Sequence, residues 1–84
     1  MVFQVLIEKK ALKFLNNLEV EHRERLKSAM LKLNDPFLGR HDIKKLKGYK
    51  NKFRLRVGDY RALFEIEKDA VKIFDIFHRG KGYK

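Results

Sequence analysis

Hydrophobic residues follow two different spacings along this chain, and the change falls at its one proline, Pro36. Residues 2–7 are apolar and rich in β-branched side chains, which predicts a short β-strand. From residue 9 to residue 34, apolar side chains recur at helical spacing: Ala11, Leu12, Leu15, Leu18, Leu26, Ala29, Met30 and Leu33. This spacing predicts two amphipathic helices packed as a hairpin, which ends at Asn34-Asp35-Pro36.

Three strand-like runs follow an irregular stretch that contains Gly39 and Gly48, and they cover residues 51–57, 60–67 and 70–78. Gly58-Asp59 is typical of a two-residue hairpin turn between the first two runs. Such a turn places apolar pairs on one face: Val57 with Tyr60, Leu55 with Ala62, and Phe53 with Phe64. The other face then pairs Arg56 with Arg61, Arg54 with Leu63, and Lys52 with Glu65. A slip of one residue would mix the two faces, so the register is well specified.

A second turn at Lys68-Asp69 extends the same two faces into the third run. It pairs Ile66 with Val71 and Phe64 with Ile73 on the apolar face, and Glu65 with Lys72 on the other. Asp75 does not fit, because this register places it on the apolar face beside Ala62. A β-bulge, a strand end, or a buried carboxylate with hydrogen-bond partners would each account for it.

These elements predict a single domain over residues 1–84 with the order β-α-α-β-β-β. The predicted fold class is α+β, with an antiparallel sheet that carries the helical hairpin on its apolar face. The first strand joins the sheet at an edge or beside the last strand.

The charge of the chain is strongly positive and unevenly distributed. The formal net charge is +10 over 84 residues, with 21 Lys and Arg against 11 Asp and Glu. Residues 1–42 hold eight basic and six acidic residues, whereas residues 43–84 hold thirteen and five. Such an excess favours a polyanionic partner, and a solvated, solubilising face is the alternative.

Several functional classes are excluded by composition. The chain has no cysteine, and its three histidines lie far apart in sequence, so we expect neither a disulfide nor a bound metal. The N-terminus lacks the pattern of a signal peptide, and no apolar stretch approaches the roughly 18 residues that cross a bilayer. We therefore expect a cytoplasmic protein without membrane association.

The predicted register concentrates cations on one strand face. Arg56 and Arg61 become direct cross-strand neighbours, and like charges in that position destabilise a sheet. An anion between them would remove the repulsion and accept charge-assisted hydrogen bonds. The pattern favours a nucleic-acid backbone, whose binding face we expect to include Lys44, Lys45, Lys47, Lys50 and Arg56.

Three residues near the C-terminus add chemistry to this face if the chain folds back toward it. His78 is able to transfer protons near neutral pH, and Arg79 is able to stabilise the charge of a phosphorane. Tyr83 is able to stack on a base or to hydrogen-bond a ribose hydroxyl. Frayed terminal residues are the alternative interpretation.

The chain resembles the RelE/ParE toxin superfamily in three segments. These are Leu46-Lys47-Gly48, the run from Phe53 to Arg61 (Phe-Arg-Leu-Arg-Val-Gly-Asp-Tyr-Arg), and Ile76-Phe77-His78-Arg79. The resemblance implies a toxin of a type II toxin–antitoxin pair. Its RelE branch implies a ribonuclease, free of metal and cofactor, that cleaves mRNA in the A site of the 30S ribosomal subunit. There the 2′-hydroxyl attacks the adjacent phosphate, and the 5′-oxygen leaves.

The same resemblance implies the site residues and the partner. The implied catalytic residues are Lys52, Arg54, Arg61, Arg79 and Tyr83. Arg54 replaces a lysine of the best-known branch and stays protonated, so the general base would be Lys52 with a depressed pKa, or His78. The implied partner is an acidic, RelB-like antitoxin that forms a hetero-oligomer with the toxin.

Other functions remain open at this point. The ParE branch implies a toxin without nuclease activity that acts on a topoisomerase. A non-catalytic RNA-binding module, or a degenerate toxin that survives only within a repressor complex, also fits the charge pattern.

Overall fold

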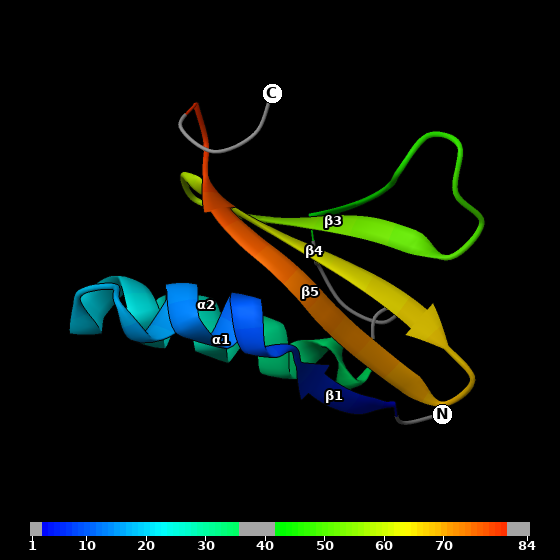
Figure 1. Ribbon diagram of the computed structural model, residues 1–84, viewed down its shortest axis with the longest axis horizontal. Helices are drawn as coiled ribbons and strands as arrows, with labels where there is room; N and C mark the ends of the chain where they lie inside the picture. Colours follow the sequence, from blue (N-terminus) through cyan, green and yellow to red (C-terminus); the bar gives the residue numbers. More distant parts are fainter. Residues whose placement is uncertain (1–2, 36–41, 81–84) are drawn as a thin grey trace.

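Two helices cover one face of a five-stranded sheet in the computed structural model of the chain, which describes residues 3–35 and 42–80 (Figure 1). The elements, in chain order, are β1 (Gln4–Ile7), α1 (Lys9–Asn16), α2 (Val20–Leu31), a short 3-10 helix (Lys32–Asn34), β2 (Ile43–Lys45), β3 (Lys52–Val57), β4 (Tyr60–Glu67) and β5 (Ala70–His78). The predicted α+β class and the helical hairpin on one face are both confirmed.

The sheet has the strand order β1-β5-β4-β3-β2, and it is mixed, because β1 runs parallel to β5. The predicted antiparallel pairing holds for β3, β4 and β5, and the direction of β1 is what makes the sheet mixed. Two-residue turns force antiparallel pairing within the hairpins of β3, β4 and β5, whereas the helices and three strands separate β1 from β5 in the chain, so no turn fixes their relative direction. Its placement beside the last strand was one of the two predicted positions.

Strand β2 was not predicted, because residues 42–50 lack an alternating pattern. It consists of three residues, and Ile43, Lys44 and Lys45 pair with Leu55, Arg54 and Phe53 of β3. The strand depends on its neighbour, since Ile43 packs against the core beside Leu55 while the two lysines are exposed.

The predicted register of the hairpins is confirmed. All six pairs from Lys52–Glu65 to Val57–Tyr60 join β3 to β4 as expected. Between β4 and β5 the pairs Ile66–Val71, Glu65–Lys72 and Phe64–Ile73 also hold. The two faces of the sheet therefore differ in character, one apolar against the helices and one cationic.

A β-bulge in β5 resolves the misplaced aspartate. Phe64 pairs with Ile73 but Leu63 pairs with Asp75, so Phe74 is an extra residue without a partner in the register. The shift returns Ile76 to the apolar face opposite Ala62. Asp75 instead lies 3.6 Å from the ammonium of Lys10 on α1.

The core lies between the helices and the apolar sheet face. Its largest fully buried side chains are Phe64, Leu15, Leu26, Met30, Leu33, Ile73 and Val71. Phe53 stacks on Phe64, with their ring centroids 5.4 Å apart. Within the described ranges, neither helix is both long enough and apolar enough to cross a membrane.

Replacing Leu26 by alanine should lower the free energy of unfolding by about 2–5 kcal/mol, because it leaves a cavity between α2 and the sheet. Urea denaturation followed by circular dichroism measures the change. The matched control is Val20→Ala on the same helix, where 62% of the side chain is exposed and a change within about 0.5 kcal/mol is expected. Equal losses in both variants would contradict this account of the core.

Candidate functional site

A cleft of about 230 Å³ lies on the sheet face away from the helices. Its lining residues are Leu46, Arg54, Arg61, Leu63, Phe77, Arg79 and Gly80. Three apolar side chains share this lining with three arginines, and no carboxylate of the described residues contributes to it. The cleft therefore has an apolar part and an uncompensated positive charge.

Arg61 is the buried cation of the site, with 9% of its surface exposed. Its Nη1 donates hydrogen bonds to the carbonyl oxygens of Gly58 (3.1 Å) and Tyr60 (3.0 Å), which fixes the guanidinium against the β3–β4 turn. Burial lowers the pKa of Arg61 most, and the charges of Arg56, Arg54 and Arg79 lower it further, whereas Asp42 raises it. Because arginine still stays protonated near neutral pH, this residue is a permanent positive charge.

Arg54 has an unused hydrogen-bond donor. Its Nε is buried and has no partner among the described residues, although buried polar atoms are nearly always paired. The residue lies between Lys44 of β2 and Leu63 of β4 in the register. An anion that enters the cleft would find this guanidinium incompletely satisfied.

Arg79 reaches the cleft because the end of β5 is tied to the β3–β4 turn. Its backbone N–H donates to the carbonyl oxygen of Asp59 at 2.6 Å. Gly80 follows with φ +82°, a left-handed conformation that glycine adopts without strain, and nothing lies within 4 Å of where a Cβ would be. The exposed side chain of Arg79 is therefore positioned beside Arg61 by backbone contacts, with Arg61 in β4 and Arg79 in the turn after β5.

Arg56 faces Arg61 as predicted, but it does not line the cleft. Its guanidinium forms an ion pair with the Asp42 carboxylate at 2.5 Å, and its backbone N–H donates to the Asp42 carbonyl oxygen at 3.0 Å. Both residues line a separate groove of about 450 Å³, together with Arg25 of α2, Lys32 of the 3-10 helix and neighbouring residues. The anionic neighbour that relieves the predicted repulsion is thus a side chain of the protein itself.

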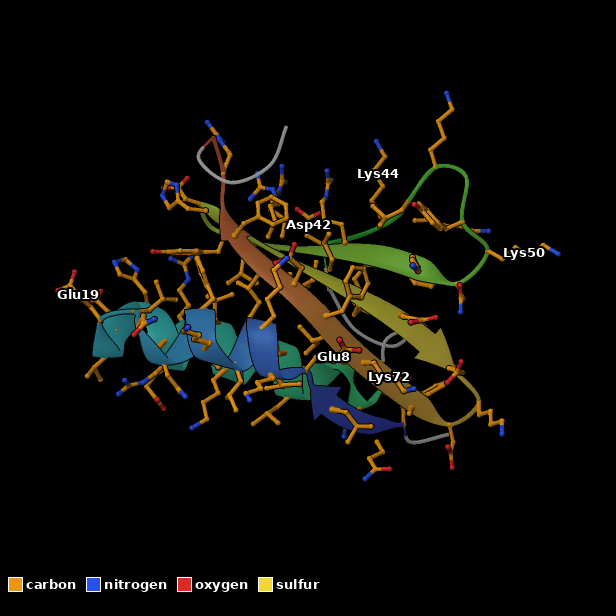
Figure 2. The ribbon with its side chains drawn as sticks, viewed as in Figure 1. Glu8, Glu19, Asp42, Lys44, Lys50 and Lys72 are labelled. Carbon is orange, nitrogen blue, oxygen red and sulfur yellow. The ribbon has the colours of Figure 1, made fainter. Side chains whose placement is uncertain are left out.

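Lys52 lies two residues before Arg54 on β3 and outside the cleft lining. Its Nζ is 4.8 Å from the ring centroid of Tyr49 and 5.4 Å from that of Phe74. The four lysines predicted to bind RNA, Lys44, Lys45, Lys47 and Lys50, are all exposed. Figure 2 shows Lys44 and Lys50 pointing outward from this side of the molecule.

His78 lies away from the cleft, on the opposite face of the sheet. Strand alternation places Phe77 opposite Arg61, whereas His78 pairs with Tyr60. The imidazole contacts the Tyr60 ring edge-on, with centroids 5.2 Å apart, and its Nδ1 lies 2.8 Å from the Arg79 carbonyl oxygen, which accepts the hydrogen bond. Tyr83, also predicted for the site, lies outside the described residues.

Sequence reasoning missed the apolar residues of the cleft and the partner of Arg56. Extending the register past the bulge would have placed Phe77 opposite Arg61. The residues around Asp42 do not indicate that it pairs with Arg56, because the two side chains come into contact only when β2 pairs with β3. In the described parts of the chain, no three His, Asp or Glu side chains gather as metal ligands would.

Replacing Asp42 by asparagine should lower the free energy of unfolding by about 0.5–1 kcal/mol, because Arg56 then faces Arg61 without a counter-charge. The loss should be larger at low ionic strength than at high ionic strength, since salt screens the repulsion. Urea denaturation at both salt concentrations measures it.

The matched control for this variant is Glu67→Gln at the other end of β4. It removes an exposed ion pair in which Lys72 Nζ lies 2.9 Å from the carboxylate. That hydrogen bond lowers the pKa of Glu67 and raises the pKa of Lys72. Glu67 and Lys72 lie outside the arginine cluster, so this variant exposes no repulsion between arginines. Its loss of stability should therefore depend less on salt. The same salt dependence in both variants would show that the arginine cluster contributes nothing.

Comparison with known proteins finds a family model that matches most of the chain and a relative that matches part of it. Residues 5–83 match the model of a family described as the ParE toxin of type II toxin–antitoxin systems, parDE. Toxin RelE3 of Methanocaldococcus jannaschii is 45% identical over 42 residues, which make up 50% of this chain and 48% of that protein. The matched segment therefore spans about half the length of this relative.

Two solved structures are similar over most of the chain. A chain of the archaeal RelE–RelB complex from Pyrococcus horikoshii OT3 has a TM-score of 0.81 and 28% identity, covering 98% of this chain and 100% of its own. A chain of the RelB–RelE antitoxin–toxin complex from Methanococcus jannaschii has a TM-score of 0.73 and 31% identity, covering 87% and 88%.

Proposed function

This chain belongs to the ParE toxin family of type II toxin–antitoxin systems, and we propose that it is a toxin that cleaves messenger RNA in the ribosomal A site. The proposed reaction takes place in the cytoplasm and uses no metal. The 2′-oxygen of one ribose attacks the adjacent phosphorus, and the bond from phosphorus to the 5′-oxygen breaks. The products are a 2′,3′-cyclic phosphate and a 5′-hydroxyl, with the 2′ proton removed and the leaving oxygen protonated.

The observation that supports this proposal best is the meeting of Arg54, Arg61 and Arg79 around one partly apolar cleft. Their charge is not neutralised by a carboxylate in the described part of the lining. Arginine donates two parallel hydrogen bonds to phosphate oxygens, so a phosphodiester would satisfy the cleft. The apolar side chains Leu63 and Phe77 provide contact for the ribose and base.

The arginines would act mainly by electrostatic stabilisation of the transition state. Arg61 is held in place by the carbonyls of the β3–β4 turn, so its charge is preorganised toward the phosphorane. Arg79 approaches from the end of β5, and the free Nε of Arg54 adds a donor. Since arginine does not act as a base, we assign proton removal to Lys52 rather than to His78, whose ring lies on the other face. Tyr83 stays a prediction.

A second candidate is a ParE-like toxin that acts on a topoisomerase without cleaving RNA. It is favoured by the description of the matched family, which names ParE. The arginine cleft favours the nuclease, because a toxin that only binds protein has no need for three cations that converge on one cleft. An RNA-binding module without catalysis would use the same cleft, and cleavage is the property that separates the two.

We also propose an acidic antitoxin as the partner. The two similar solved structures are complexes of RelE with RelB. A net charge of +10 would attract an acidic chain, and covering the cationic cleft would block RNA. The toxin and antitoxin would then form a hetero-oligomer.

The variants Arg61→Ala and Arg79→Ala should each reduce mRNA cleavage by about 100-fold or more, the usual cost of removing one preorganised donor. Primer extension after induced expression locates the cut ends, and translation inhibitors test dependence on the ribosome. The control is Lys27→Ala, an exposed cation on α2, which should cleave normally. Undiminished cutting by the double arginine variant would refute this site. Toxicity of the unaltered protein without cut mRNA would favour the topoisomerase alternative.

A small acidic protein encoded beside this chain would be the expected antitoxin, and its association rate with the toxin should fall steeply as salt increases. Stopped-flow or surface plasmon resonance measurements at several ionic strengths give the slope. The double variant Arg61→Ala/Arg79→Ala should flatten the slope, while Lys27→Ala should leave it nearly unchanged. A slope that the arginines do not alter would show that the antitoxin binds elsewhere.

A further inference from the structure

Beside the arginine cleft, two aromatic rings that the proposed reaction does not use lie against Lys52. The Nζ of Lys52 lies over both Tyr49 (4.8 Å) and Phe74 (5.4 Å), which come from the loop before β3 and from β5. Tyr49 is the one aromatic among the large apolar side chains that are markedly exposed in the described residues, at 51%. An exposed ring held beside a cation is a surface on which a planar ligand can stack.

The loop that presents Tyr49 is tied down at several points. The N–H of Leu46 donates to the Lys52 carbonyl oxygen (2.9 Å), and the N–H of Tyr49 donates to the Leu46 carbonyl oxygen (3.3 Å). Asn51 Nδ2 donates to the Glu65 carboxylate (3.2 Å) and to the Ile66 carbonyl oxygen (3.3 Å) of β4. The backbone around the exposed ring is therefore held in place, which reduces the entropy lost when a ligand binds.

Neither the core nor the strand register requires the second ring. Phe74 is the extra residue of the β-bulge, without a partner in the β4–β5 register. Its neighbours Ile73 and Ile76 belong to the core, whereas Phe74 itself is half-buried and lies against Lys52 on the cationic face. A phenylalanine at this position needs another reason, because a smaller or polar residue would also complete the bulge.

We propose that Tyr49 and Phe74 form a stacking subsite for one base of the bound RNA, next to the phosphate held by the arginines. The inference rests on the proposed function and adds a contact that the arginines do not make. Lys52 and Arg54 are two residues apart on β3, about 7 Å along the strand, so the subsite lies within reach of a neighbouring nucleotide. Aromatic rings beside backbone-binding cations are the usual means of holding single-stranded nucleic acid.

The cluster changes its contacts when RNA binds. In the free protein the ammonium of Lys52 occupies the ring faces. An RNA phosphate attracts this ammonium more strongly than the rings do, because it carries a full negative charge. The base then takes the place of the ammonium against Tyr49, and Lys52 moves toward the ribose and phosphate. The same movement of Lys52 therefore frees Tyr49 for the base and brings the residue assigned to proton removal toward the ribose.

The test uses single-stranded RNA hexamers with 2′-O-methyl riboses, which cannot be cleaved, and with 2-aminopurine at each position in turn. Stacking on an aromatic ring quenches 2-aminopurine fluorescence. We expect strong quenching at one position with the unaltered protein. Tyr49→Leu should remove it and weaken binding about ten-fold or more, the scale of one base stacked on one ring. Phe74→Leu should reduce the quenching, and Tyr49→Phe should preserve it.

Each other outcome overturns the inference. Quenching that survives in Tyr49→Leu would place the base elsewhere. Loss of quenching in Tyr49→Phe would assign the effect to the hydroxyl and not to stacking. Weaker binding by Tyr49→Leu without any quenching in the unaltered protein would mean that the rings only hold Lys52. The control is Leu12→Ala on α1, an exposed apolar residue far from the cleft, and thermal denaturation confirms that every variant is folded.

The double variant Arg61→Ala/Arg79→Ala separates this inference from the proposed function. It should weaken binding of every hexamer and reduce the dependence of affinity on salt, because it removes phosphate contacts. If it does so while Tyr49→Leu binds normally, only the stacking subsite is wrong. If the arginine variant also binds normally, the proposed RNA cleft itself is wrong.

Discussion

The two-residue turn at Gly58-Asp59 is the constraint on which the cationic face depends. It sets the register of β3 and β4, and this register decides on which face of the sheet each charged side chain of these two strands lies. Gly58 has φ +58°, and a Cβ there would meet the Arg25 guanidinium at 3.2 Å. The carbonyl of Gly58 also accepts a hydrogen bond from Arg61, and that of Asp59 accepts one from the Arg79 N–H. One turn therefore both pairs the strands and positions two of the three cleft arginines.

The arginines of the cationic face lie close together, but they differ in whether a carboxylate of the protein neutralises their charge. Arg56 has a carboxylate partner in Asp42, so it turns toward the groove beside α2. Arg61, Arg54 and Arg79 have no such partner in the described cleft lining. Burial lowers the pKa of Arg61 most, and the charges of Arg56, Arg54 and Arg79 lower it further. Among the described residues, this separates Arg56, which has a carboxylate partner, from the three arginines of the cleft.

The β-bulge in β5 has consequences on both faces of the sheet. On the apolar face it removes a carboxylate from the core and returns Ile76 to its place beside Ala62. On the cationic face it adds Phe74, which meets Lys52 together with Tyr49. The shift also places Phe77 in the cleft and His78 against Tyr60. A single extra residue thereby decides which side chains near the C-terminus reach the site.

Local patterns in the sequence were sufficient for the α+β class, the helical hairpin, the β3–β4 register and the face that carries Lys52, Arg54 and Arg61. Alternation and a two-residue turn act over a few residues, so they can be read without knowing the rest of the molecule. Only the tertiary structure decided that β1 runs parallel to β5, that β2 exists, and that Asp42 removes Arg56 from the cleft. It also decided the bulge and therefore the position of His78. These features depend on which distant segments pack together, and neither alternation nor turn chemistry contains that information.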